Sequence, residues 1–194
     1  MKKIYIVLTH TGTLLSRIIK TYTKDEFSHV SIALDEELNK MYSFGRLFAS
    51  NPFWGGFVHE RINNGTFKRF KLTEAGVYSL VVTDEQYDNI VKTISKIRKN
   101  RKLYHFNIIG LLAVGFHKRI HTEYSFYCAE FVRYVLKEAG IEFSLPEIIK
   151  PEDFKTIESM QLIYKGKLKD YGNKRKTLVK DIVEASIRKT SFAK

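Results

Sequence analysis

The stretch YSFYCAEFVRYVL, residues 124–136, contains the only cysteine of the chain and passes from a run of aromatic residues into a helical pattern. Apolar residues then recur at helical spacing, at Cys128, Val132, Val135 and Ala139. This spacing predicts an amphipathic helix that begins near Cys128, with Ser125 as a candidate N-cap and Gly140 as the residue that ends it. The fold must therefore bury one face of this helix.

Cys128 has two interpretations at this position. An unpaired cysteine most often packs as a small apolar side chain in a protein core. In the first turn of a helix, however, unpaired backbone N–H groups and the helix dipole favour a thiolate. The backbone N–H of Cys128 is also placed to form half of an oxyanion hole for acyl transfer. Cys128 is thus a candidate nucleophile.

A thiol nucleophile needs a base, and histidine is the usual base near neutral pH. Of the six histidines, the one with the clearest context is His29 in FSHVSIALD, residues 27–35. Apolar and small or polar residues alternate there, which predicts a half-buried strand. Ser31 and Ala33 share the face of His29 and are short, so this face is predicted to receive the Cys128 helix. The alternative is a structural histidine that bonds a loop carbonyl.

Three short motifs together resemble the circularly permuted papain-fold hydrolases of the NlpC type, especially the YiiX/YaeF-like amidases. In that family a T-G-S-x-x-S-like segment precedes S-H-V-G-I, and C-[SA]-E-F-V follows. The matching residues here are Thr11, Gly12, Thr13 and Ser16, then Ser28, His29 and Val30, then Cys128, Ala129, Glu130, Phe131 and Val132. The resemblance implies a permuted papain-like α+β fold, in which an antiparallel sheet packs against helices that include the cysteine-bearing helix.

The resemblance also implies Cys128 as nucleophile, His29 as general base and acid, and a third polar residue that orients the imidazole. Relatives carry histidine, glutamate or another strong acceptor on the next strand. Strand alternation in MYSFGR, residues 41–46, gives Ser43 that position, and a serine hydroxyl stabilises an imidazolium poorly. Glu60 in GGFVHE, acting from a third strand, is the alternative orienting residue.

Further residues near these motifs have open roles. Tyr127, beside the nucleophile, is a possible second oxyanion donor or a packing residue. Trp54, in the predicted loop of residues 49–56, is a possible substrate contact. Glu130 matches the family motif and either caps the helix, is solvated or takes part in chemistry.

The rest of the chain predicts one domain of 194 residues, with a basic helix at about residues 174–194 appended. Strands are expected at residues 2–8, near Phe57, and at residues 67–71, 77–82 and 160–168. Helices are expected at residues 14–22, 84–99, 107–116, 151–159 and 178–189. The helix at residues 107–116 is expected to be buried, because its apolar run is too short to cross a bilayer.

The formal net charge of +12 indicates attraction to anions, or simply a solvated basic surface. The basic residues concentrate in KIRKNRK, HKRIH and KLKDYGNKRK. Nucleic acid, anionic lipid and acidic peptide or cell-wall fragments are the partners that this charge allows.

The cysteine content and the first residues of the chain bear on cofactors and on cellular location. A single cysteine cannot form an internal disulfide, and scattered histidines do not suggest a zinc site, so no metal or organic cofactor is expected. The apolar run after Met1 ends at Leu8 and lacks a signal-peptide cleavage site, which predicts a cytoplasmic protein.

The expected function is that of a thiol hydrolase that cleaves an amide or ester bond, such as a peptide or cell-wall-type amidase. One alternative is a lipid acyltransferase or thioesterase-like enzyme at anionic membranes. The other is a catalytically silent basic module that binds nucleic acid.

Overall fold

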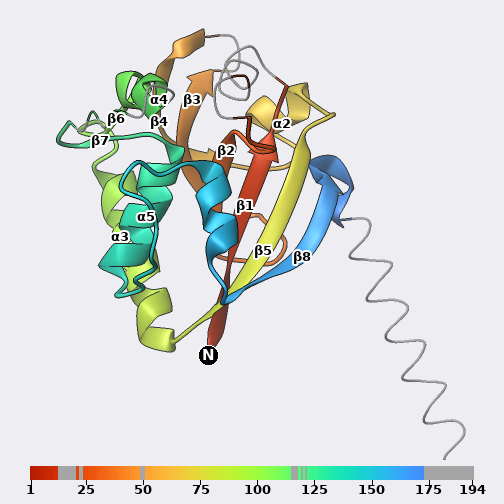
Figure 1. Cartoon of the computed structure of the whole chain (residues 1–194), viewed down its shortest axis with the longest axis vertical. Coiled ribbons are helices and arrows are strands. Elements are labelled where there is room, and N and C mark those ends of the chain that lie inside the picture. Colours follow the sequence, from red (N-terminus) through yellow and green to blue (C-terminus); the bar gives the residue numbers. More distant parts are fainter. Residues whose placement is uncertain are drawn as a thin grey trace, which may run out of the picture.

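The computed structural model describes residues 1–12, 21, 24–48, 51–114, 118, 120 and 122–172, without the side chains of residues 46–48 and 51–54. The described chain forms an α+β fold around a six-stranded antiparallel sheet with the strand order β4-β3-β2-β1-β5-β8 (Figure 1). The predicted helix at residues 14–22 except Thr21, the predicted helix at residues 174–194, and the motif residues Thr13 and Ser16 lie outside the described residues.

The sheet places the N-terminal strand in its interior. Its strands are β1 (Lys2–His10), β2 (His29–Ala33), β3 (Met41–Phe48), β4 (Asn51–Glu60), β5 (Glu74–Val82) and β8 (Met160–Lys167). β1 pairs with β2 on one side and with β5 on the other, and its residues 4–9 are buried. A strand buried on both faces reads as a continuous apolar run, as IYIVL does here.

Helices and short elements complete the fold. They are α2 (Gly65–Arg69), α3 (Asp84–Lys99), α4 (Ile108–Val114), α5 (Cys128–Glu138), the 3-10 helices η1 (Pro151–Thr156) and η2 (Leu168–Asp170), and the two-residue strands β6 (His105–Phe106) and β7 (Ser125–Phe126). β6 and β7 pair with each other in parallel, and β7 leads directly into α5.

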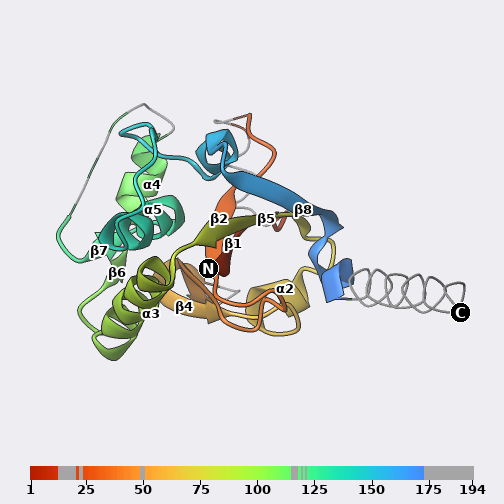
Figure 2. The same cartoon turned by 90° about the horizontal axis from the view of Figure 1, so that it is seen from below.

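Each face of the sheet has its own apolar cluster. On one face, Val30 and Ile32 of β2 share a cluster with α3 and α5, including Phe131 of α5. On the other face, Ala33 shares a cluster with Phe67 of α2. Figure 2 shows α3 and α5 together on one side of the curved sheet and α2 on the other.

Most element types agree with the sequence predictions. The predicted strands at residues 2–8, 77–82 and 160–168, the strands that contain His29 and Ser43, and the helix at residues 84–99 are confirmed. The helix α3 begins at Asp84 because Thr83 and Gln86 form a capping box, which satisfies two backbone N–H groups.

Several local predictions were wrong. Residues 65–69 form α2 where a strand at 67–71 was predicted, and β4 already begins at Asn51, within the predicted loop. The helix α4 is not fully buried, because Ile109 is 64% exposed. The N-cap of α5 is Tyr127, since Ser125 lies in β7.

Candidate active site

His29 is the first residue of β2 and is held by contacts on both sides. It pairs with Thr9 of β1. The preceding Ser28 donates its backbone N–H to the carbonyl of Thr9 over 3.0 Å. One residue earlier, the backbone N–H of Phe27 donates to Oε1 of Glu152 over 2.7 Å, so η1 fixes the segment that leads into β2.

The strands β2 and β3 pair over only two residues, so the backbone of His29 is not paired with β3. The pairs are Ile32 with Tyr42 and Ala33 with Met41. Beyond them, the Ser43 hydroxyl donates to the carbonyl of Val30 over 2.7 Å and bridges the two strands. Gly45 follows, and a Cβ atom on Gly45 would lie 3.5 Å from Cε1 of His29. The imidazole therefore lies against a part of β3 that has little side-chain bulk.

Glu60, the last residue of β4, reaches over β3 to His29. Its Oε1 lies 3.0 Å from Nε2 of His29, and the two side chains are 14% and 20% exposed. Its second oxygen, Oε2, accepts a short hydrogen bond from the hydroxyl of the fully buried Ser31. The Ser31 oxygen also lies 3.4 Å from Nε2 of His29. Both oxygens of this carboxylate are thus fixed on the β2 side.

Cys128 is the first residue of α5 and meets the same imidazole. Its side chain is hydrogen-bonded to His29. Since Nε2 of His29 is bonded to Glu60, Nδ1 is the ring nitrogen left for the sulfur. Cys128 is buried, with 3% of its surface exposed. Its backbone N–H lies in the first turn of the helix, where amides have no intrahelical acceptor.

The electrostatics of the site favour a charged imidazole. Burial by itself lowers the pKa of His29, because desolvation penalises the charged form. The negative charge of Glu60, the hydrogen bonds with Cys128 and Glu60, and the charge of Cys128 outweigh burial and raise the pKa of His29 to about 10. The ring is therefore a cation held between two groups that carry negative charge when ionised.

Of the two residues considered for orienting His29, the geometry favours Glu60. Strand alternation pointed to Ser43, but the hydroxyl of Ser43 is engaged with the Val30 carbonyl, and the side chain is fully buried. Strand alternation predicts the face of the sheet on which Ser43 lies. It does not predict that the Ser43 hydroxyl already donates to a backbone carbonyl.

The other predicted site residues have different surroundings. The hydroxyl of Tyr127 donates to the carbonyl of Ile149 over 2.9 Å, so it braces the segment before η1. Glu130 is buried, and its Oε2 accepts the backbone N–H of Tyr127 over 3.3 Å, which is a helix-capping contact. The side chain of Trp54 lies outside the described residues.

Sequence reasoning misjudged how the cysteine helix meets β2. The small face of Ser31 and Ala33 was expected to receive this helix, but α5 packs against the face of Val30 and Ile32. Ser31 instead bonds Glu60, a role that its position two residues after His29 on the same strand face could have suggested.

The described residues contain neither a metal-binding cluster nor a membrane-spanning helix. Within the residues that the structure describes, no group of three or more histidine, cysteine or acidic side chains is placed to hold a metal ion. None of the described helices has the length and apolarity required to cross a membrane.

No protein-family model matches the chain, and no curated protein matches its sequence.

Proposed function

We propose that this protein is a thiol hydrolase that cleaves an amide or ester bond, with a fold of the permuted papain-like, NlpC type. The observation that carries the proposal is the hydrogen-bonded series Cys128, His29 and Glu60, contributed by α5, β2 and β4. A nucleophile, a base and a group that orients the base are the three components that covalent acyl transfer requires.

The proposed reaction begins with attack of the Cys128 sulfur on the carbonyl carbon of the substrate. The oxyanion that forms accepts a hydrogen bond from the backbone N–H of Cys128. The imidazolium of His29 then donates its proton to the leaving amine or alcohol as the carbon–heteroatom bond breaks, which leaves a thioester. His29 next takes a proton from water, the hydroxide attacks the thioester, and the acid product leaves as the thiolate re-forms.

Glu60 has an orienting role in this proposal. Its carboxylate fixes the ring through Nε2 and stabilises the positive charge of His29. Ser31 holds the second carboxylate oxygen, so Glu60 has less freedom to turn away from the imidazole. Ser43 stands where the resembled family has a strong hydrogen-bond acceptor. In this proposal Glu60 supplies that acceptor, so His29 is still oriented and stabilised as the base.

The test is an assay of acyl-enzyme formation and turnover. The wild-type chain would be incubated with activated esters and with peptide, muropeptide and acyl-lipid libraries, and the adduct on Cys128 would be followed by mass spectrometry. Cys128→Ala and His29→Ala should abolish turnover. His59→Ala is the matched control, because exposed His59 bonds the carbonyl of Asn39 and, as the neighbour of Glu60 on β4, points to the opposite face of the strand.

The alternatives give different results in the same assay. Turnover of acyl-lipids alone would identify lipid acyl transfer or thioester cleavage. A silent binding module would show no His29-dependent adduct, and Cys128 would react no faster than a free cysteine. That result would contradict the proposed hydrolase.

A further inference from the structure

The described residues of 101–114, 118, 120 and 122–124 form a surface that combines exposed aliphatic side chains with positive charge. The exposed apolar residues, here called the docking face, are Leu103 (59%), Ile109 (64%), Leu112 (46%), Ile120 (42%) and Tyr124 (49%). Aliphatic side chains exposed to this degree on several neighbouring residues are a mark of an interaction surface.

Local contacts hold the docking face together. The side-chain amide of Asn107 donates to the carbonyl of Ile120 over 2.8 Å, which keeps Ile120 beside the start of α4. The backbone N–H of His105 donates to the carbonyl of Tyr124, and the rings of Tyr104 and Tyr124 meet edge to face at 5.6 Å. The docking face is therefore a folded surface built on β6, α4 and the turn before β7.

The helix α4 presents its apolar residues in two directions. Leu111, Ala113 and Val114 are buried. Ile109 and Leu112, three residues apart and so on one side of the helix, are exposed. The exposed pair is thus not required by the core, and nothing else among the described residues covers it.

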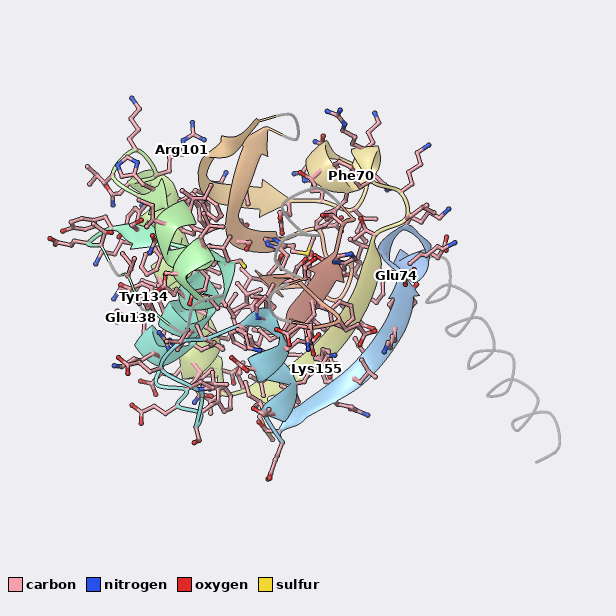
Figure 3. The ribbon with its side chains drawn as sticks, turned by 45° about the horizontal axis from the view of Figure 1, so that its top comes forward. Phe70, Glu74, Arg101, Tyr134, Glu138 and Lys155 are labelled. Atoms are coloured by element: carbon pink, nitrogen blue, oxygen red, sulfur yellow. The ribbon has the colours of Figure 1, made fainter. Side chains whose placement is uncertain are left out.

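The charge around the docking face is mainly positive. Arg101, Lys102 and Lys118 are exposed, and Glu123 is the acidic residue of the same segment. One further acid, Glu138 of α5, acts electrostatically on Tyr104 beside this surface. Figure 3 shows Arg101 at the edge of the molecule where α3 ends, and Figure 1 shows β6, β7 and α4 gathered at the corner opposite β8. An occupant of this surface should be apolar within and anionic at its surface.

We propose that the docking face binds the interface of a membrane that contains anionic lipids. Aliphatic side chains enter the boundary between headgroups and acyl chains, and lysine and arginine attract the negative headgroups. Nucleic acid offers phosphate to the same cations but gives Ile109 and Leu112 no apolar environment. The surface also lies on the segment that leads into β7 and α5, the helix that begins at Cys128.

The experiment measures binding of the full chain to vesicles of phosphatidylcholine with and without phosphatidylglycerol by co-sedimentation. The double variant Ile109→Ser/Leu112→Ser should bind the anionic vesicles more weakly by about tenfold or more, because two aliphatic side chains no longer enter the interface. Leu72→Ser/Leu162→Ser is the matched control, since these residues are exposed elsewhere and should leave binding unchanged.

A second pair of variants tests the charge. Arg101→Gln/Lys102→Gln should weaken binding to anionic vesicles by about tenfold or more, because each cation near the surface contributes to the attraction. Lys92→Gln/Lys96→Gln removes the same charge from exposed positions of α3 and should have a smaller effect. Thermal unfolding of each variant shows whether its fold is kept.

Four results would overturn the proposal. The first is that the wild type does not bind vesicles, and the second is that Ile109→Ser/Leu112→Ser binds them as well as the wild type does. The third is that the matched controls lose as much vesicle binding as the test variants. The fourth is that Ile109→Ser/Leu112→Ser loses as much binding to a DNA oligonucleotide as it loses to vesicles. Cys128→Ala should bind vesicles as the wild type does, so a failure of the hydrolase proposal and a failure of the docking face are separate results.

Discussion

Nε2 of His29 lies 3.0 Å from Oε1 of Glu60, which joins the first residue of β2 to the last residue of β4 across the intervening strand β3. The contact is possible because β3 contributes Ser43 and Gly45 at this level, and a long carboxylate side chain can pass over them. The charge of the imidazole therefore depends on a residue two strands away.

Replacing Glu60 by glutamine should separate its charge from its shape. The amide keeps the size of the side chain but removes the negative charge that raises the pKa of His29, so this pKa should fall. Alkylation of Cys128 by iodoacetamide at neutral pH should slow by about tenfold, since the cationic partner of the sulfur is lost. A proton NMR titration of His29 and the alkylation rate measure the two effects.

Ser43→Ala is the companion variant, because alternation of β3 made Ser43 the other candidate for orienting His29. The alkylation rate should change little, while the free energy of unfolding should fall by about 1 kcal/mol, since the Val30 carbonyl loses its donor. If Ser43→Ala slowed alkylation as much as Glu60→Gln, the assignment of the orienting role to Glu60 would be incorrect.

Replacing Glu130 by alanine should destabilise the protein through the start of α5. Oε2 of Glu130 accepts the buried backbone N–H of Tyr127, and that donor would be left without this acceptor. The free energy of unfolding should fall by about 1–2 kcal/mol in urea denaturation. Glu138→Ala, at the exposed end of the same helix, should have almost no effect. Equal losses in the two variants would argue against the capping role.

Gly55 and Gly45 should respond differently to alanine. A Cβ atom on Gly55 would lie 2.6 Å from the nearest side-chain carbon of Phe106, whereas one on Gly45 would lie 3.5 Å from Cε1 of His29, an ordinary contact. Gly55→Ala should therefore cost about 1–3 kcal/mol by overpacking, and Gly45→Ala much less. Because the nearest atom is the Cβ atom of Phe106, adding Gly55→Ala to Phe106→Gly should cost much less than adding it to the wild type, which would attribute the cost to this contact.

The same glycine shows where sequence patterns predict the fold and where they do not. Proline and paired glycines in NPFWGG predicted a loop, but Gly55 lies in β4 because Phe106, a distant residue, packs against its backbone. The strand predicted at residues 67–71 is the helix α2, and the signal for it was Asn64, whose side chain caps Gly65. Tertiary contacts and caps outweighed local alternation in both segments.

The elements that carry Cys128 and His29 could be predicted from the sequence, but the contact between His29 and Glu60 could not. The start of α5 at Cys128 and the strand at His29 follow from periodicity. The contact between His29 and Glu60 depends on the β3–β4 register, in which Met41 pairs with Glu60. Register is set by packing across the whole sheet, so the sequence left Ser43 and Glu60 as open alternatives.

The raised pKa of His29 should make the stability of the protein depend on pH in the alkaline range. The pKa of the His29 imidazole is the ordinary 6.5 when the chain is unfolded and about 10 when it is folded. Between these values the folded state holds a proton that the unfolded state has released, so unfolding becomes easier as pH rises. The contribution is complete below about pH 6.5 and is lost as pH rises through about 10.

Comparison of the wild type with His29→Gln isolates this effect from the titration of other groups. Urea denaturation at a series of pH values should show that the stability advantage of the wild type shrinks by at least about 1 kcal/mol between pH 6.5 and 10. His59→Gln is the matched control, because exposed His59 bonds a backbone carbonyl and has no acidic partner in that contact. If the difference between wild type and His29→Gln stayed constant over this range, the imidazole would not be held as a cation between Cys128 and Glu60, and the proposed acyl transfer would lose the proton donor on which it depends.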